Sequence, residues 1–532
     1  MNEKQIKKLS RRSFLKAGGL VAGAVAAGVV TGCGDPDVNI VEPSSSGTPT
    51  SNLPSTWDGE ADLVLIGFGG AASMAAIQAV KDQPSVKILI LEAQKSGGGS
   101  TKICGAGTYL GCGTKSQTDA GFTETADQLY NVAVATAGVG ANTELLRVWA
   151  DNMKETYDSL IDIGFKYGKY ADGYFSSPDN GAPDGANVSL LWDNEKRPGM
   201  SSETPVPHIH FGLAEEGSTR AGTFWKALED RVKSLSNVTI TYETEAKQLL
   251  VNSDGRVVGV KAKKGGSTLN FKASKAVMVA TGGFINNDEM VAQFIPHALN
   301  CWRGGNAMDT GTGIKMAQSI GADVKGMSGA EDWYPTYHPV SAIVKGIAVN
   351  EYGDRFCSED VSGPVMGRWV ARVYNSTYMI FDKTIMDEIP TANQTTLGAV
   401  QANSIAELAT ALGINEDSLE STVDRYNAYA VAGQDKQFQK DTAILQEIKT
   451  APFYAVAHVN MAVFTLSTGG LCINTETQVM DTAGEVIKGL YAAGATTAHI
   501  NAEHYLTGGG TSGAFSFGRL AGKAMVKETN WE

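Results

Sequence analysis

Short apolar runs separated by glycines mark the first structured part of the chain. The stretch DLVLIGFGGAASMAAIQAV begins with the apolar run Leu63–Ile66, which is short enough to be a buried parallel strand. Small apolar residues then continue at helical density to Val80. A second apolar run, in VKILILEAQ, ends at the acidic residue Glu92. This order predicts a strand, a helix and a second strand of a parallel sheet.

The turn between the first strand and the helix has the spacing of a dinucleotide-binding site. Gly67, Gly69 and Ala72 match G-x-G-x-x-G/A. The first glycine permits a tight turn, the second lets the backbone approach a pyrophosphate, and the third small residue lets the helix pack on the strand. The pyrophosphate would lie at the helix N-terminus, and Glu92 could bind ribose hydroxyls. The alternative is a strand–helix turn that binds no ligand. Because strand, glycines, helix, second strand and acid all occur in the expected order, a dinucleotide-binding turn is favoured.

The residues that follow Glu92 favour FAD over NAD. Glycines and hydroxyl side chains run from Gly97 to Gly107, where NAD-dependent folds usually continue into a helix. The stretch GRVVGVKAKKGGSTLNFKASKAVMVATGGF predicts a hairpin followed by a separate buried strand that ends at 281–283, and another late strand ends at a glycine turn around Gly494. The expected cofactor-binding residues are Gly67, Gly69, Gly70, Ala71, Ala72, Glu92, Ala93, Gly99, Ser100, Thr101, Gly105, Gly107, Ala246, Thr281, Gly282, Gly494, Gly510 and Ser512.

Composition supports a large folded protein. The chain has 532 residues, of which 42% are hydrophobic and 19% charged, so a sizeable core is expected and wholesale disorder is not. The net charge of −13 argues against nucleic acid as the main partner, because such proteins favour a basic surface.

The first 33 residues predict an export signal. The stretch SRRSFLKAGG carries Arg11 and Arg12 in twin-arginine form, ahead of an apolar run too short and glycine-rich for a comfortable membrane span. The run closes on VTGC, which resembles a lipobox in which Cys33 would be lipidated, and a plain signal peptide is the alternative. Residues 34–57, rich in Pro, Ser, Thr and Gly, predict a flexible tether. The expected location is the outer face of the cytoplasmic membrane or the periplasm.

Taken together, the motifs resemble the FAD-dependent fumarate reductase/succinate dehydrogenase flavoprotein superfamily, which includes ketosteroid dehydrogenases and urocanate reductase. They are, in family order, GFGGAA, GGGSTKICGAG, ATGGF, VNEYGDRFCSED, STGGLCIN and GLYAAG…FGRLAG, spread over roughly residues 60–530. The resemblance implies an α/β fold with non-covalent FAD. Its split Rossmann-like FAD-binding domain would cover 58–325 and 453–532, with an α+β capping domain inserted at 326–452 and the substrate held under that cap.

Three positions depart from the fumarate reductases of this superfamily. Their proton-donor arginine, four residues past the glutamate of RFCSE, corresponds to Gly363, their carboxylate-holding histidine to Leu466, and their bidentate arginine to Tyr505. An unpaired carboxylate in a closed site is costly, so these changes favour a neutral substrate.

Tyr505 is the first candidate for catalysis. The stretch Tyr505-Leu506-Thr507 resembles the Tyr-x-Ser of ketosteroid 4-dehydrogenases, and a phenol can donate a hydrogen bond or a proton to a carbonyl-bearing substrate. Packing of the ring on the flavin is the alternative. The stretch HYLTGGGTSG is expected to be a loop too rich in glycine for a helix, with the helix running over Phe515–Lys523.

The stretch EDWYPTYHPV supplies further candidates. It gathers Trp333, Tyr334, Tyr337 and His338, and the fumarate reductases have a His-Pro facing the substrate at the place of His338. Tyr334, Tyr337 and His338 are therefore catalytic candidates beside Tyr505, and an ordinary aromatic cluster is the alternative.

Metal sites are not supported. His208 and His210 lie at strand spacing without a visible third ligand, which favours core packing. The cysteines form no C-x-x-C and no C-x-x-C-H, so neither an iron–sulfur set nor a haem is expected. Electrons would therefore be exchanged with an outside partner, such as a membrane-bound multihaem cytochrome or a quinol-linked protein.

The predicted function is reduction of a C=C bond conjugated to a carbonyl, in a steroid-like enone, an unsaturated lactone or an aryl acrylate. Three alternatives remain open: a ketosteroid-type dehydrogenase running in the opposite direction, a fumarate- or urocanate-type carboxylate reductase, and a flavin electron-relay protein without a substrate.

Overall fold

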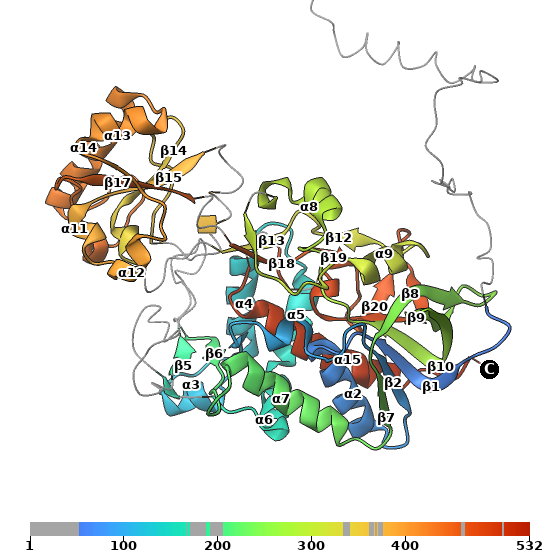
Figure 1. Cartoon of the computed structure of the whole chain (residues 1–532). Helices are drawn as coiled ribbons and strands as arrows, with labels where there is room; N and C mark the ends of the chain where they lie inside the picture. Colours follow the sequence, from blue (N-terminus) through green and yellow to red (C-terminus); the bar gives the residue numbers. More distant parts are fainter. Residues whose placement is uncertain are drawn as a thin grey trace, which may run out of the picture. The chain divides into compact units, whose positions relative to one another are not determined.

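The computed structural model describes residues 53–167, 169–170, 188–191, 206–299, 301–333, 341–360, 366–367, 370, 376–458, 463–498, 500–502 and 505–531 (Figure 1). The predicted signal and lipobox, most of the tether, Gly363 and the candidates Tyr334, Tyr337 and His338 lie outside these ranges. Within them, no helix combines the length and the hydropathy needed to cross a membrane.

An eight-stranded sheet forms the centre of the main body. Its principal strands follow the order β20 (Gln478–Met480), β21 (Val486–Ala492), β10 (Ser267–Val279), β1 (Gly59–Ile66), β2 (Ile88–Leu91) and β7 (Val238–Thr241). All neighbours on this path are parallel except β20 and β21. Strands from both ends of the chain share this sheet, so the predicted α/β class and the split of this domain along the chain are confirmed.

Strand β10 corrects one detail of the sequence prediction. The predicted hairpin strand and the separate buried strand are one continuous strand of 13 residues. Its first half pairs antiparallel with β9 (Val257–Lys264), which also pairs with β8 (Thr244–Val251). Its second half pairs in parallel with β1 and β21. The first half of the strand is partly exposed and carries polar residues, whereas the second half is buried and apolar. The sequence therefore looks like two separate strands.

Two helices pack together on the glycine turn. Helix α2 (Gly70–Asp82) follows β1, and α15 (Gly509–Met525) comes from the far end of the chain (Figure 1). A Cβ at Gly518 would lie 2.3 Å from the carbonyl oxygen of Ala71, so this close helix contact requires glycine there.

Smaller elements complete the main body. Its other helices are α3 (Lys115–Asp119), α4 (Ala126–Ala137), α5 (Thr143–Asp151), α6 (Met153–Ile163), α7 (Arg220–Lys233), α8 (Asp288–Phe294) and α9 (Thr312–Gln318). Its other strands are β3 (Gly107–Tyr109), β4 (Lys169–Tyr170), β5 (Val188–Leu191), β6 (Ile209–Phe211), β11 (Trp302–Arg303), β12 (Val324–Lys325), β13 (Ala330–Trp333), β18 (Val463–Ser467) and β19 (Gly470–Leu471).

The inserted segment forms an α+β unit with its own packing. Its antiparallel sheet follows the order β14 (Ile347–Asn350), β15 (Thr377–Asp382), β17 (Phe453–Ala457) and β16 (Val400–Ala402). Its helices are α11 (Lys383–Met386), α12 (Thr391–Gln394), α13 (Ile405–Leu412) and α14 (Glu416–Ala432).

Alternate residues of β15 face two separate apolar clusters of the inserted unit. Met379 and Phe381 belong to one cluster and Ile380 to the other. The clusters run from Ile343 to Val456, whereas Met327 packs in the main core. The range 326–452 stays a prediction, beside clusters that span Ile343 to Val456 among the described residues.

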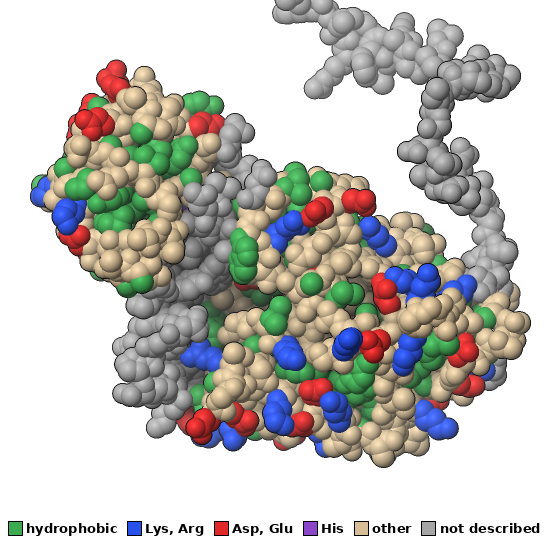
Figure 2. Space-filling view, viewed as in Figure 1, with side chains coloured by type: hydrophobic (Ala, Val, Ile, Leu, Met, Phe, Trp, Pro, Cys, Tyr) green, Lys and Arg blue, Asp and Glu red, His purple; other side chains and the backbone are tan. Residues whose placement is uncertain are grey.

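Charges are mixed on the visible surface. On the face in Figure 2, Lys and Arg side chains lie among Asp and Glu side chains. That face carries no basic track of the kind that nucleic-acid binding uses.

Candidate functional site

A cavity of about 550 Å³ lies at the carboxyl ends of the parallel strands. Residues that follow β1, β2, β10 and β21 line it, including Phe68, Ala93, Thr281 and Gly494. This is the edge at which open α/β sheets bind ligands.

The glycine turn forms an open cradle in this cavity. Gly67 has φ +96°, and a Cβ there would lie 2.5 Å from the carbonyl oxygen of Ala280. A Cβ at Gly69 would meet only one atom, 3.8 Å away, so space remains above the start of α2. The first turn of α2 has no acidic residue and no side-chain cap. Gly70 donates its N–H to Thr101 Oγ1 at 3.1 Å, and the remaining N–H groups of this turn can bind an anion such as a pyrophosphate.

Glu92 is held rigidly at the edge of the cavity. Its Oε2 accepts a hydrogen bond from the N–H of Phe68 and its Oε1 from the N–H of Gln94, each at 2.8 Å. A carboxylate has about four acceptor positions, so two remain for ribose hydroxyls.

Unused hydrogen-bonding groups in the cavity fit a polar ligand. The Oγ1 atoms of Thr281 and Thr507 are buried, and neither has a partner among the described residues. Buried hydroxyls normally have partners, so these two fit the polar groups of a dinucleotide.

Asp309 joins two parts of the cavity wall. Its Oδ2 accepts from Ser100 Oγ at 2.8 Å and from the N–H of Asn306 at 3.1 Å. Burial raises its pKa to about 6. Sequence reasoning missed Asp309, because only the fold brings its loop to Ser100.

Most predicted cofactor residues lie together at this cavity. All of those named above line it except Ala72 and Ser512. Ala72 is fully buried in α2, and Ser512 Oγ accepts a hydrogen bond of 2.9 Å from Trp149 Nε1. Further lining residues that the prediction did not include are, among others, Gln94, Ile103, Cys104, Thr244, Trp302, Met308, Asp309, Glu331 and Thr465.

Tyr505 lines the same cavity as Glu92. Its side chain is buried, and its Oη accepts a hydrogen bond of 2.9 Å from the N–H of Gly510. In this contact the oxygen accepts, so the phenolic hydrogen is not used in it. A Cβ at Gly510 would lie 2.9 Å from Tyr505 Oη and 3.3 Å from Leu466 Cδ2, so these two side chains are neighbours.

The glycine-rich stretch after Tyr505 was wrongly predicted as a loop. Helix α15 begins at Gly509 and includes the glycines that follow. Gly508 precedes it with φ +81°, and its carbonyl oxygen accepts a hydrogen bond of 3.1 Å from the N–H of Tyr109. Packing on β3 and α2 outweighs the low helix propensity of glycine.

The comparisons with known proteins identify the cofactor. A sequence model of the family described as FAD binding domain matches residues 62–512. The chain belongs to this family. Its cofactor is therefore FAD, as the glycine turn, Glu92 and the residues that follow Glu92 together predicted.

The relatives of this FAD-binding protein are oxidoreductases. It is 27% identical over 477 residues to NADH:fumarate oxidoreductase of Klebsiella pneumoniae (strain 342). The aligned region covers 88% of this chain and 48% of that protein. The chain thus spans about half the length of that relative. It is 26% identical over 595 residues to digoxin reductase of Eggerthella lenta, covering 98% of each chain.

A solved structure shares this fold. The 3-ketosteroid-Δ4-(5α)-dehydrogenase of Rhodococcus jostii RHA1, solved in complex with 4-androstene-3,17-dione, matches with a TM-score of 0.80 and 28% identity. The match covers 89% of this chain and 98% of that one. The resemblance to the fumarate reductase and ketosteroid dehydrogenase superfamily is confirmed.

His208 and His210 do not line the FAD cavity and belong to the core. His208 Nε2 lies 2.6 Å from Glu124 Oε1, and His210 Nε2 lies 2.7 Å from Thr114 Oγ1. Burial lowers the pKa of His210 to about 3, so it is neutral at neutral pH. No cluster of three or more metal-ligating side chains occurs within the described ranges.

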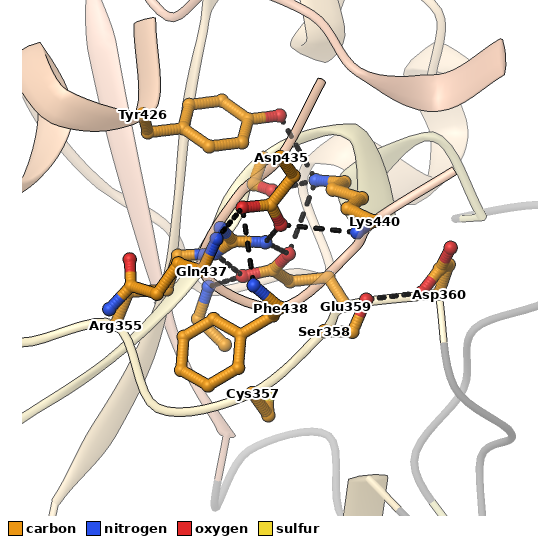
Figure 3. A network of polar contacts seen from close by, with 12 residues as sticks. Arg355, Cys357, Ser358, Glu359, Asp360, Tyr426, Asp435, Gln437, Phe438 and Lys440 are labelled. Carbon is orange, nitrogen blue, oxygen red and sulfur yellow. Dashed lines mark hydrogen bonds and ion pairs between the residues drawn. The ribbon is translucent and has the colours of Figure 1, made fainter. Parts of the chain in front are cut away.

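Glu359, of the motif RFCSE, belongs to a buried ion network in the inserted unit (Figure 3). Arg355 donates from Nε and Nη2 to the two oxygens of Glu359, each at 2.7 Å, and its Nη2 also lies 2.8 Å from Asp435 Oδ2. Lys440 Nζ lies 3.3 Å from Glu359, and burial lowers its pKa to about 8. The network ties the motif to the loop after α14, and removing one partner would leave a buried charge uncompensated.

Proposed function

We propose that this flavoprotein reduces a C=C bond conjugated to a carbonyl in a neutral substrate. The observation that carries the proposal is the composition of the cavity wall: in the described part of the chain it includes no Lys, Arg or His, and a tyrosine lies beside Leu466. A carboxylate substrate would need cationic partners there, whereas a carbonyl needs a hydrogen-bond donor.

Tyr505 is the proposed donor. When bound and reduced by the electron donor, the flavin would supply a hydride to the β-carbon of such a substrate. A proton must then reach the α-carbon, and the Tyr505 hydroxyl either delivers it or polarises the carbonyl. The hydrogen bond from Gly510 fixes the position of the phenol oxygen, which keeps the donor oriented.

The relatives support a neutral, ring-bearing substrate. Similarity to digoxin reductase extends over nearly the whole chain, and the solved ketosteroid dehydrogenase holds a steroid dione. Dehydrogenation is the reverse reaction and uses the same groups. Because one relative is a fumarate oxidoreductase, a carboxylate reductase is the second candidate function. The described part of the cavity wall argues against it, since that part has no Lys, Arg or His to bind a carboxylate.

We further propose that the protein acts outside the cytoplasm on a lipid anchor, supported by the twin arginines and the VTGC stretch. Since no haem-attachment motif occurs in the sequence, a membrane-bound cytochrome or quinol-linked protein would supply the electrons.

A panel of unsaturated compounds tests the proposed reaction. Protein reduced with dithionite is mixed anaerobically with enones, unsaturated lactones, aryl acrylates and fumarate, and the flavin absorbance is followed. Rapid reoxidation by a neutral enone or lactone is the expected result. Reoxidation by fumarate alone would favour the carboxylate reductase, and reoxidation by none would favour an electron-relay protein.

A further inference from the structure

The described wall of the FAD cavity carries charges of one sign. Its acidic lining residues are Glu92, Glu245, Asp309 and Glu331, and no Lys, Arg or His lines the part of the wall that the structure describes. A ligand in this cavity therefore meets carboxylates from several directions.

Three of these carboxylates have evident local roles. Glu92 accepts two backbone hydrogen bonds. Glu245 forms an ion pair of 2.5 Å with Lys247 and is more than a third exposed, so solvent screens it. Asp309 binds Ser100. None of them lies on the wall shared by β13 and β18.

Glu331 does lie on that wall, and it lines the same cavity as Tyr505. It belongs to β13, and the hydroxyl of Thr465, on the paired strand β18, donates to its carboxylate. Leu466 is the next residue after Thr465 and is the neighbour of Tyr505. Glu331, Thr465, Leu466 and Tyr505 all line this one cavity, in which we propose that the substrate reacts.

Cys104 is another lining residue of this cavity. Its pKa is raised to about 11, chiefly by burial and further by the negative charge of Glu331.

We propose that Glu331 is a specificity-determining residue that excludes substrates with an ionised carboxylate next to the reacting double bond. The inference rests on the proposed function and names the side chain that restricts its substrate class. Two unit charges about 6 Å apart, at an effective dielectric constant of about 20, repel each other enough to change binding about a hundredfold. A neutral carbonyl does not experience this repulsion.

The variant Glu331→Gln isolates the charge. Glutamine has the same shape, and its amide oxygen can still accept the hydrogen bond from Thr465. Cinnamate and benzylideneacetone form a matched pair of probes, because both carry a phenyl ring and a conjugated C=C bond while only cinnamate is ionised. Their dissociation constants are measured on the oxidised protein from the change in flavin absorbance, and their reoxidation rates on the reduced protein.

In Glu331→Gln, the affinity for cinnamate is expected to rise by at least about tenfold, while the affinity for benzylideneacetone changes by less than about threefold. Glu289→Gln is the matched control: it removes the same charge at a side chain that is 91% exposed and does not line the cavity. Both affinities should be unchanged in this control.

The outcomes separate the inference from the proposed function. If benzylideneacetone reoxidises the flavin but the affinity ratio is the same in the parent and in Glu331→Gln, the role of Glu331 is overturned and the proposed function stands. If neither compound reoxidises the flavin, the proposed function loses its support, and the two dissociation constants still decide whether Glu331 excludes the anion.

Discussion

Replacing Tyr505 by phenylalanine separates its catalytic role from its packing role. The substitution removes one hydroxyl, and with it the acceptor for the N–H of Gly510 at 2.9 Å. A lost hydrogen bond of this kind costs about 1 kcal/mol of stability, which in a protein of this size is a shift of a few degrees or less in Tm. The ring is retained, so FAD binding should be normal.

The expected effect on rate is larger. Loss of one positioned donor typically lowers a rate by about a hundredfold or more, which corresponds to at least about 2.7 kcal/mol in the activation barrier. Stopped-flow reoxidation of dithionite-reduced protein by a neutral enone measures this rate directly. Tyr491→Phe is the matched control, since its hydroxyl binds Glu528 at 2.8 Å and the residue does not line the cavity. If Tyr505→Phe reoxidises at the parent rate, Tyr505 only packs and the donor lies elsewhere.

Three further predictions concern the cofactor, acid stability and export. Gly69→Trp should abolish FAD binding by filling the cradle, whereas Gly69→Ala should retain it, because a Cβ there meets only one atom 3.8 Å away; flavin absorbance per protein after gel filtration decides. His210 has a pKa of about 3 when folded and about 6.5 when unfolded, so between these pH values the unfolded chain binds the extra proton. The free energy of unfolding should therefore fall as pH drops through that window, by up to about 1.4 kcal/mol per pH unit, and chemical denaturation should show a shallower fall in His210→Gln. Arg11→Lys with Arg12→Lys should leave the flavoprotein in the cytoplasm, and Cys33→Ala should release it from the membrane; cell fractionation that finds the latter variant still membrane-bound would refute the lipid anchor.

The parts of the site that the sequence predicted are local in the chain. A strand, a glycine turn and a helix are formed by consecutive residues, so the spacing of Gly67 and Gly69 is enough to identify the cradle. Glu92 follows the next strand and is found by the same reasoning.

The parts that the sequence did not predict depend on contacts between distant segments. Asp309 reaches Ser100, and Glu331 reaches Thr465, only because the sheet and its loops bring these segments together. The glycines at the start of α15 look unfavourable for a helix, and only packing against Tyr109 and its neighbours makes them helical.

A single turnover in D₂O tests the central claim most directly. The protein is reduced in D₂O without oxygen, mixed with one equivalent of a neutral enone, and the product is examined by mass spectrometry. The proposed reaction adds one hydrogen through the flavin, whose N5 hydrogen exchanges with solvent, and one from an exchangeable protein acid. The saturated ketone should therefore carry two deuterium atoms, one on each former alkene carbon, with one equivalent of flavin reoxidised. Recovery of the unreacted enone with the flavin still reduced would contradict the account.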